Sequence, residues 1–283
     1  MLSTGEAVDL CVTTADNQNL TIPQKLLLTW HFRFGHLNFK SVQWVLRSGT
    51  FGKTPGISSA AGKCEPPKCA ACEYGKARRR GPTKASITSP VPEREHALKG
   101  DVLFPGQRVS IDHFECSAKG RLISSSRGKT PAEDMYRGGA IFVDQASSYI
   151  WIQPQVTFSA EETLRAKLDY ERMCLAYGVN ILTYMSDNGA FGSSEFVADI
   201  QSRNQAAEYS GVGAHHHNGV AERAIQTISN MSRTMMLHAA VRWQDMADSA
   251  LWPLAVEYAV YIFNHMPNIE SGTAPIDIFT STS

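Results

Sequence analysis

The chain has 283 residues, of which 43% are hydrophobic and 19% are charged. This composition is typical of a soluble globular protein with material for about two domains, and it excludes an intrinsically disordered chain. The 27 Lys and Arg residues balance the 27 Asp and Glu residues, but the net charge is −3 over residues 1–20, +10 over residues 21–100 and −7 over residues 101–283, so a polyanionic partner is not excluded for the basic segment.

Helices are expected in the basic segment. Apolar residues recur at three- and four-residue steps over residues 21–48, which predicts helical structure. Residues 49–63 are rich in Gly, Ser and Pro and predict a loop. The three prolines of residues 82–92 predict a linker between two domains.

Beyond the linker the apolar pattern changes to the alternation of strands. Strands are expected at residues 108–114, 139–143, 149–153, 180–185 and 206–212. Helices are expected at residues 161–177, 194–204 and 218–240, with a final buried helical segment at residues 243–263 that is interrupted near Pro253. Three strands in hairpin order followed by alternating helix and strand predict a mixed α/β domain.

Neither end of the chain predicts secretion or a membrane anchor. The first residues, MLSTGEAVDLCV, lack the basic and apolar regions of a secretory signal peptide. The most apolar stretch, residues 250–263, contains Pro253 and Glu257 and is too short to span a bilayer. We therefore expect a protein that is not secreted, has no membrane partner and keeps its six cysteines reduced.

Two pairs of potential zinc ligands lie in the basic segment. His31 and His36 are five residues apart, and Cys69 and Cys72 form a C-x2-C knuckle. Zinc prefers four nitrogen or sulfur ligands in a tetrahedron, so the two pairs predict a structural zinc site. The alternatives are ordinary helix histidines with buried cysteines, or Cys64 as a less favoured ligand. The three remaining cysteines are expected to be structural: Cys11, Cys116 and Cys174.

Three carboxylates in the second segment could meet at one point. Asp112 lies within an expected strand, Asp187 directly follows another, and Glu222 opens the long helix. Convergence there would hold two divalent cations of the kind that promote phosphoryl transfer. Each has an ordinary alternative, namely an arginine partner, a turn and a helix-dipole position. Other carboxylates also compete for this role: Glu115, Asp134, Asp144 in its hairpin turn, Glu195 and Glu208.

The motifs HFRFGHLNF, CAACEYGKARR, RVSIDHFE, FVDQASSYIW, MSDNGAFGSSEF and HNGVAERAIQTI, in this order, resemble the integrase of Ty1/copia-type retrotransposons. The resemblance covers nearly the whole chain from about Leu20 onward. It implies a fold of the α/β class, a ribonuclease H-like mixed five-stranded sheet with flanking helices, preceded by a small helical zinc-binding domain.

The resemblance also implies the roles of individual residues. The zinc ligands would be His31, His36, Cys69 and Cys72. The D, D, E triad would be Asp112, Asp187 and Glu222, holding two Mg²⁺ or Mn²⁺ ions for 3′-end processing and strand transfer. The expected partners are the element's cDNA ends and target DNA, with a homo-oligomer assembled on them, in a nuclear or cytoplasmic retroelement particle.

Three departures from the family pattern stand out. Between Asp187 and Glu222 lie 34 residues, where the pattern has about 35. Residues 116–137 are longer and more polar than expected and predict a loop in the first hairpin. His215, His216 and His217 replace a more usual lead-in to the long helix, and we expect a plain loop there.

The domain boundaries follow from the motifs. We expect an amino-terminal tail (1–20), a zinc-binding domain (21–80), a linker (81–105), a catalytic core (106–240) and a helical extension of the core (241–283). The chain lacks D-S/T-G protease and Y-x-D-D polymerase motifs and a basic tail. It is therefore expected to be a piece of a polyprotein or a decayed genomic copy. The alternatives to an integrase are a catalytically silent nucleic-acid-binding remnant and a nuclease that cuts without joining.

Two surfaces are expected to contact nucleic acid. The first is the basic run Lys76, Arg78, Arg79 and Arg80, for which a solvated surface run is the alternative. The second is the polar face of the long helix: Glu222, Arg223, Gln226, Asn230 and Arg233. Apolar residues near Trp243, Trp252 and Tyr261 could support self-association, but a buried core is the favoured expectation.

Overall fold

The amino-terminal part of the chain is a small helical module in a computed structural model, which describes residues 19–49, 59–77, 104–123, 131–186, 190–209 and 218–280. The module contains α2 (Ile22–Arg33), α3 (Phe39–Ser48) and α4 (Ala70–Gly75). A capping box between Thr21 and Gln24 starts α2. The side chain of Asn38 caps α3 by accepting a hydrogen bond from the Ser41 amide at 2.9 Å.

The helical structure expected over residues 21–48 is thus two helices, α2 and α3. Gly35 and His36 both adopt positive φ angles, +58° and +60°, which no helix can continue through. We call residues 21–80 the amino-terminal module from here on. Its residues 50–58 and 78–80 lie outside the described ranges.

A mixed five-stranded sheet follows, as the sequence predicts. Its strands are β1 (Val109–Gly120), β2 (Tyr136–Asp144), β3 (Ile150–Gln155), β4 (Thr183–Ser186) and β5 (Ala206–Tyr209), in the order β3-β2-β1-β4-β5. The first three strands pair antiparallel, whereas β4 pairs parallel with β1 and β5 parallel with β4. The strand β1 is longer than expected: it runs on to Gly120, which pairs with Tyr136 after an irregularity in register between Glu115 and Gly120. The expected loop of residues 116–137 is correspondingly shorter.

The remaining helices are α5 (Ala160–Ala176), α6 (Ser194–Ser202), α7 (Gly219–Arg242), α8 (Trp252–His265) and α9 (Pro275–Thr280). The expected helical segment of residues 243–263 is two short 3-10 turns followed by α8. Pro253 lies in the first turn of α8 rather than interrupting a helix, because its missing N–H has no partner to lose there. None of the helices described is long and apolar enough to cross a membrane.

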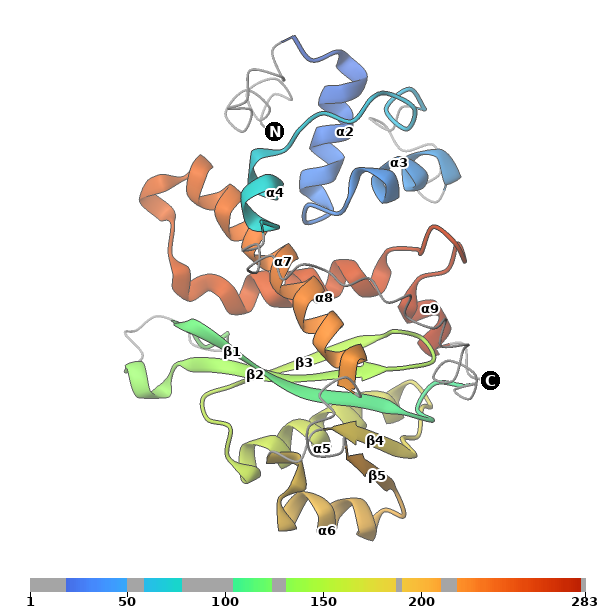
Figure 1. Cartoon of the computed structure of the whole chain (residues 1–283), viewed down its shortest axis with the longest axis vertical. Coiled ribbons are helices and arrows are strands. Elements are labelled where there is room, and N and C mark those ends of the chain that lie inside the picture. Colours follow the sequence, from blue (N-terminus) through green and yellow to red (C-terminus); the bar gives the residue numbers. More distant parts are fainter. Residues whose placement is uncertain are drawn as a thin grey trace, which may run out of the picture.

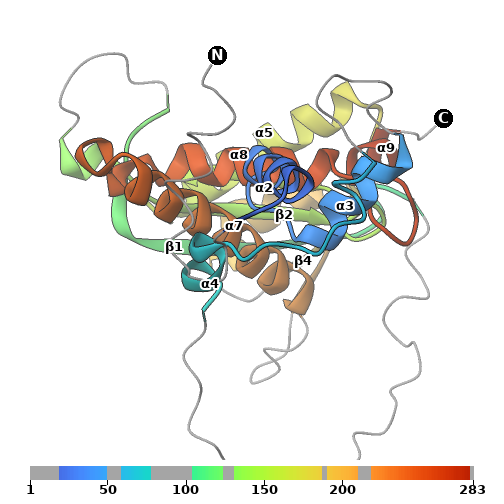
Figure 2. The ribbon, with the colours of Figure 1, turned by 90° about the horizontal axis from the view of Figure 1, so that it is seen from above.

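The elements are stacked in layers (Figure 1). The amino-terminal module lies over α7 and α8, these helices cover one face of the sheet, and α5 and α6 cover the other. Figure 2, viewed from above, shows α2 nearly end-on over the layer that contains α8. The carboxyl end of the described chain, α9, packs against α8.

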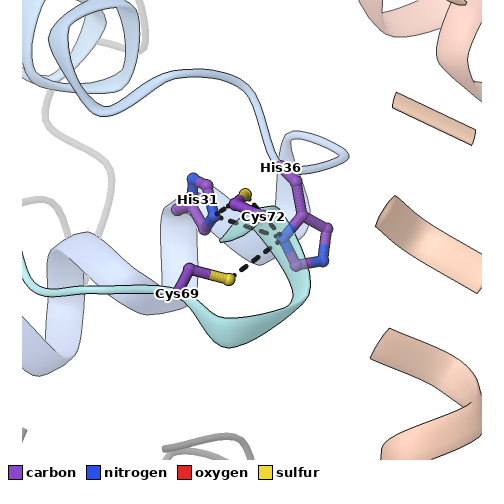
Figure 3. Close-up of side chains that lie close together, drawn as sticks. All are labelled: His31, His36, Cys69 and Cys72. Carbon is purple, nitrogen blue, oxygen red and sulfur yellow. Dashed lines mark hydrogen bonds between the residues drawn. The ribbon is translucent and has the colours of Figure 1, made fainter. Parts of the chain in front are cut away.

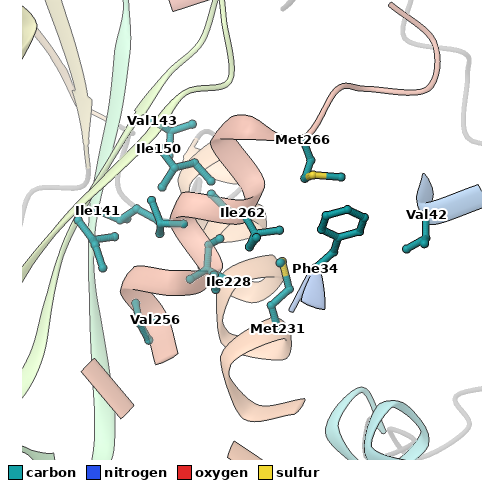
Figure 4. Packing of buried hydrophobic residues seen from close by; sticks show 14 of the residues in the cluster. Phe34, Val42, Ile141, Val143, Ile150, Ile228, Met231, Val256, Ile262 and Met266 are labelled. Atoms are coloured by element: carbon teal, nitrogen blue, oxygen red, sulfur yellow. The ribbon is translucent and has the colours of Figure 1, made fainter. Parts of the chain in front are cut away.

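One hydrophobic core joins the module to the sheet. Phe34 and Val42 of the module share a cluster of buried side chains with Met231 of α7 and Ile262 of α8 (Figure 4). The same cluster continues to Ile141 of β2. A second core, under the opposite face of the sheet, includes aromatic residues of β2 and α5. The long helix α7 therefore packs against both the module and the sheet.

Candidate functional site

The two histidines and the two knuckle cysteines converge in the amino-terminal module (Figure 3). One ligand atom from each of His31, His36, Cys69 and Cys72 lies within 4.8 Å of all the others. His36 Nδ1 is 3.2 Å from His31 Nε2 and 3.5 Å from Cys69 Sγ. Cys72 Sγ is 3.2 Å from His31 Nε2 and 3.6 Å from His36 Nδ1. Within the described ranges no other group of His, Cys, Asp and Glu is placed so closely.

Local backbone geometry brings the four side chains together. His31 lies in the last turn of α2, and the left-handed Gly35 and His36 turn the chain back so that the His36 amide bonds to the His31 carbonyl at 2.9 Å. Cys69 is the cap residue before α4, and Cys72 lies in its first turn. Two ligand atoms therefore come from the end of α2 and the turn that follows it, and two come from the start of α4.

The donor set fits a zinc ion. Zn–S bonds of about 2.3 Å and Zn–N bonds of about 2.0–2.1 Å imply, in a tetrahedron, N···N separations of about 3.3 Å and N···S separations of about 3.6 Å. The observed distances of 3.2 to 3.6 Å match them. A hydrogen bond from Cys72 lowers the pKa of the Cys69 thiol, and that bond together with burial raises the pKa of Cys72. A bound divalent cation would relieve this competition, because it binds both sulfurs as thiolates.

Two further groups hold the histidine rings. His31 Nδ1 lies 2.7 Å from the Leu37 carbonyl oxygen, which leaves Nε2 facing the cluster. His36 Nε2 lies 2.7 Å from Nδ1 of His238, a residue of α7 that sequence reasoning missed. Burial lowers the pKa of His238 to about 4. No sequence signal marks His238, because its partner is 202 residues away.

The other described cysteines lie apart from this cluster. The Cys64 thiol donates to the Ala61 carbonyl at 3.4 Å, so the structure does not place the alternative ligand with the other four. Cys174 is fully buried in the core beneath the sheet, and Cys116 is half-buried on β1. Cys11 is outside the described residues.

The structure describes two of the three carboxylates of the expected triad, Asp112 and Glu222. Asp112 lies on β1, half-buried, and its Oδ1 accepts a hydrogen bond from the His113 amide at 2.8 Å. Glu222 lies in the first turn of α7 and is exposed. Asn218, one turn before Glu222, donates from Nδ2 to the carbonyl oxygen of Ile111 at 2.9 Å. This bond holds the start of α7 against β1 next to Asp112, whereas Asp187 lies outside the described residues.

Most of the competing carboxylates have other partners. Asp144 is buried at the end of β2, where it accepts hydrogen bonds from the Gly106 and Ser147 amides, as expected for a turn residue. Burial raises the pKa of its carboxyl group. Glu115 pairs with Arg137 at 2.7 Å, Glu208 pairs with Arg108 at 3.1 Å, and Glu195 accepts from the Ser194 hydroxyl. Asp134 is exposed in a 3-10 turn.

The expected nucleic-acid residues divide into two groups. Arg223 and Gln226 are exposed on α7, and Asn230 is half-buried. Lys76 donates to the His36 carbonyl at 3.0 Å within the amino-terminal module, and Arg233 of α7 donates to the Gly75 carbonyl of the module at 3.4 Å. The residues that lie outside the described ranges are Arg78, Arg79, Arg80, His215, His216 and His217.

The expectation of a buried core near Trp243, Trp252 and Tyr261 is right for one residue. Trp252 is buried, and its indole nitrogen donates to the Ala118 carbonyl at 2.9 Å. Trp243 and Tyr261 are 53% and 56% exposed, which corrects the expectation for both. Trp243 caps the carboxyl end of α7, and Tyr261 lies on the face of α8 that points away from the core.

Comparison with known proteins gives relatives of one kind. No family model matches the sequence. A retrovirus-related Pol polyprotein from transposon TNT 1-94 of Nicotiana tabacum is 26% identical over 245 residues, which are 85% of this chain and 15% of that protein. The one from transposon RE2 of Arabidopsis thaliana is 31% identical over 137 residues, 47% of this chain and 9% of that protein. The chain thus spans less than a sixth of the length of either relative.

A solved structure supports the fold. A chain of the simian T-cell lymphotropic virus intasome, in complex with PP2A regulatory subunit B56 gamma, superposes with a TM-score of 0.50 and 16% identity. The match covers 84% of this chain and 74% of that one. The chain is therefore similar in sequence to part of the Pol polyproteins of these retrotransposons, and its mixed five-stranded sheet with flanking helices is a ribonuclease H-like fold.

Proposed function

We propose that the chain is the integrase part of a retrotransposon polyprotein and that it inserts element cDNA into host DNA by phosphoryl transfer. The observation that carries the proposal is the bond from Asn218 to Ile111, which ties the start of α7, the helix that carries Glu222, to β1, the strand that carries Asp112. Carboxylates from a strand and a helix at one point supply the negative charge that divalent cations need.

The parallel pairing of β1 and β4 supports Asp187 as the third member. Ser110 pairs with Met185 in that ladder. Asp112 and Asp187 each follow their paired residue by two positions. Strands that run parallel in register therefore favour neighbouring positions for the two carboxylates, at the end of β4 where such sheets place ligands.

The oxygen ligands of Asp112, Asp187 and Glu222 fit Mg²⁺ or Mn²⁺. Two such ions, when bound, would activate the attacking oxygen and stabilise the leaving one. The chain's own residues provide the scaffold. The β1 backbone fixes Asp112, the Asn218 side chain fixes the start of α7, and the Glu222 carboxylate is exposed on the first turn of α7, where it would bind a divalent cation.

A single Zn²⁺ ion is proposed as the structural cofactor of the amino-terminal module. His31, His36, Cys69 and Cys72 would hold it, and their separations fit a tetrahedral site. The helices α3 and α4 are only ten and six residues long, so a metal that joins α2 to α4 would contribute directly to folding of the module.

The proposed partners are the element's cDNA ends and target DNA. Phosphate contacts would come from Lys76 and the arginines at 78–80, and from Arg223, Gln226, Asn230 and Arg233 along α7. A homo-oligomer on DNA is part of the proposal, and the structural likeness to a chain of an intasome supports it. The place of action would be a retroelement particle in the nucleus or the cytoplasm.

Strand transfer with the purified chain tests the proposal. The substrate is an oligonucleotide matching the element's end, with Mg²⁺ or Mn²⁺, and the expected product is that end joined to a second duplex. Asp187→Asn should lose at least 100-fold in rate, and Asp134→Asn, which changes an exposed Asp outside the site, should keep full activity. Equal activity of the two variants would remove Asp187 from the triad.

Three other outcomes separate the alternatives. Cleavage products without joined products identify a nuclease that cuts without joining. Salt-sensitive DNA binding with no product in either metal identifies a silent remnant. Full activity in the presence of a chelator that removes Mg²⁺ and Mn²⁺ contradicts the metal-dependent mechanism altogether.

A further inference from the structure

The amino-terminal module rests on two consecutive turns of α7, at Thr234, Met235 and His238. Gly75 of α4 lies so close to Thr234 that a Cβ there would lie 2.9 Å from the Thr234 Cα. A Cβ at Gly35 would lie 3.2 Å from the sulfur of Met235. One turn further along α7, His238 meets His36, with ring centroids 4.8 Å apart. Positions 234, 235 and 238 share one face of the helix, and that face is covered by the module.

The ring of His36 has different partners at its two nitrogens. Nδ1 faces His31 Nε2 and both cysteine sulfurs at 3.2 to 3.6 Å, whereas Nε2 lies 2.7 Å from His238 Nδ1. A metal ligand nitrogen carries no proton, so binding through Nδ1 requires that Nε2 carries the proton and donates it. His238 Nδ1 is then the acceptor of that hydrogen bond.

We propose that His238 is a positioning residue of the metal site: it accepts the hydrogen bond from His36 and so makes metal binding and the docking of the amino-terminal module on α7 one linked equilibrium. The inference rests on the zinc site of the proposed function and is independent of phosphoryl transfer. Linkage is reciprocal, so a metal that favours the docked module is itself bound more tightly when the module is docked.

The surroundings of His238 favour a fixed ring. The edge of Phe32 packs on it with centroids 4.3 Å apart. Arg242 lies one turn further along α7 and contributes positive charge, and Cys69 contributes negative charge. On the other side of His36, the Lys76 ammonium group binds the His36 carbonyl oxygen. The His238 side chain of α7 is thus packed against α2 and His36 rather than surrounded by solvent.

The proposed linkage also bears on the carboxylate site, because α7 carries both Glu222 and His238. Ala221, Ala224 and Ile228 in its first half are buried against the sheet side, and its second half carries the module. Glu222 and His238 are sixteen residues apart, or about 24 Å along the helix axis. A metal bound in the module would therefore stabilise the far half of the helix whose first turn carries Glu222.

Zinc affinity of the full chain tests the proposal, measured by competition with a chromogenic chelator at constant pH. His238→Leu removes the acceptor and should weaken binding about 10- to 100-fold. His238→Asn offers an amide oxygen near the position of Nδ1 and should recover most of the affinity. His265→Leu, which changes a histidine of α8 outside the module, should bind as the unmodified chain does.

Hydrogen exchange of residues 231–242 gives the second readout. Zinc should slow exchange there in the unmodified chain and in His238→Asn, and much less in His238→Leu. If the unmodified chain binds zinc but His238→Leu matches it in affinity and in exchange, the inference is overturned and the zinc site stands. If the unmodified chain binds no zinc, the proposed zinc site itself is wrong.

Discussion

In both histidine rings of the module, the nitrogen that does not face the cluster makes a hydrogen bond, and this bond orients the ring. His31 donates from Nδ1 to the Leu37 carbonyl, and its ring stacks on Phe39 with centroids 4.2 Å apart. Outer partners of this kind fix both the tautomer and the orientation of a ligand ring. The entropic cost of ordering the side chain is therefore met by the fold before a metal binds.

The two neighbouring cysteines Cys69 and Cys64 offer a matched pair of substitutions. Cys69→Ser replaces a thiolate by a weakly coordinating hydroxyl, so the purified protein should lose its one bound zinc ion and its melting temperature should fall by several degrees. Cys64→Ser changes a thiol that bonds only to a nearby carbonyl and should keep the zinc. Metal analysis and thermal denaturation of both variants check this. Equal zinc content in the two would contradict the ligand assignment.

Asn218 and Asn264 form a second matched pair. Each is a buried asparagine that ties a helix to a strand, Asn218 to Ile111 on β1 and Asn264 to Ile150 on β3. Substitution of either by alanine leaves a buried carbonyl unpaired and should lower the free energy of unfolding by about 1–3 kcal/mol. Only Asn218→Ala should also slow strand transfer at a temperature where both variants are folded, because only Asn218 holds the turn that carries Glu222. Equal rates would show that α7 is positioned by other contacts.

At this scale the sequence predicts residues whose partners are close in the chain. The spacing of His31 from His36 and of Cys69 from Cys72 was enough to propose the cluster that the structure assembles. His238 and Asn218 could not be predicted, since their partners lie 202 and 107 residues away and the pairing depends on how α7 packs. The triad remains a prediction, because Asp187 is outside the described residues.

At the scale of elements, type and order were predictable and boundaries were less so. All five strands follow from alternation and apolar runs, and α5 and α7 from helical periodicity. The sequence did not locate the break between α2 and α3, because a single glycine such as Gly35 is tolerated within a helical pattern and a histidine with positive φ has no sequence signature. Pro253 was misread as an interruption, because proline is equally compatible with a helix start.

A buried ion network between α5 and α6 was also not predicted. Lys167 is fully buried, and its ammonium group binds Glu171 at 2.8 Å and Asp199 at 2.5 Å. Arg203 reaches the same two carboxylates, and the Tyr184 hydroxyl donates to Glu171. A lysine at a core-facing helix position reads as solvated in the sequence, and only tertiary packing reveals its partners.

Asp199→Asn tests that network through pH. Burial alone would raise the pKa of Asp199, but hydrogen bonds from Lys167 and Arg203 lower it below its ordinary value of about 3.9. The ionised carboxylate therefore stabilises the folded chain above about pH 4, and this contribution is lost as the pH falls through the lowered pKa. At pH 7 the variant should be about 1–3 kcal/mol less stable in urea denaturation, and the difference should shrink below pH 4. A difference independent of pH would assign the loss to packing.

At the scale of the whole molecule, a net charge of zero conceals a basic segment, residues 21–100, and an acidic one, residues 101–283. The basic residues gather in the module and the segment after it, and the layered fold places that module on the α7 and α8 side of the sheet (Figure 1). The helices α5 and α6, on the opposite face, carry arginines that pair with local carboxylates. An approaching phosphate backbone would therefore favour one side of the molecule.

The salt dependence of DNA binding tests this division. Each phosphate contact contributes about −0.9 to the slope of log affinity against log salt concentration, because binding releases counterions. Arg79→Ala with Arg80→Ala should make the slope less steep by roughly 0.9 for each arginine that contacts phosphate. Arg165→Ala with Arg172→Ala removes the same charge from α5, where both side chains are largely exposed, and should leave the slope nearly unchanged. If both double variants lower the slope equally, binding responds to total charge rather than to a surface, and the basic segment has no particular role in holding DNA.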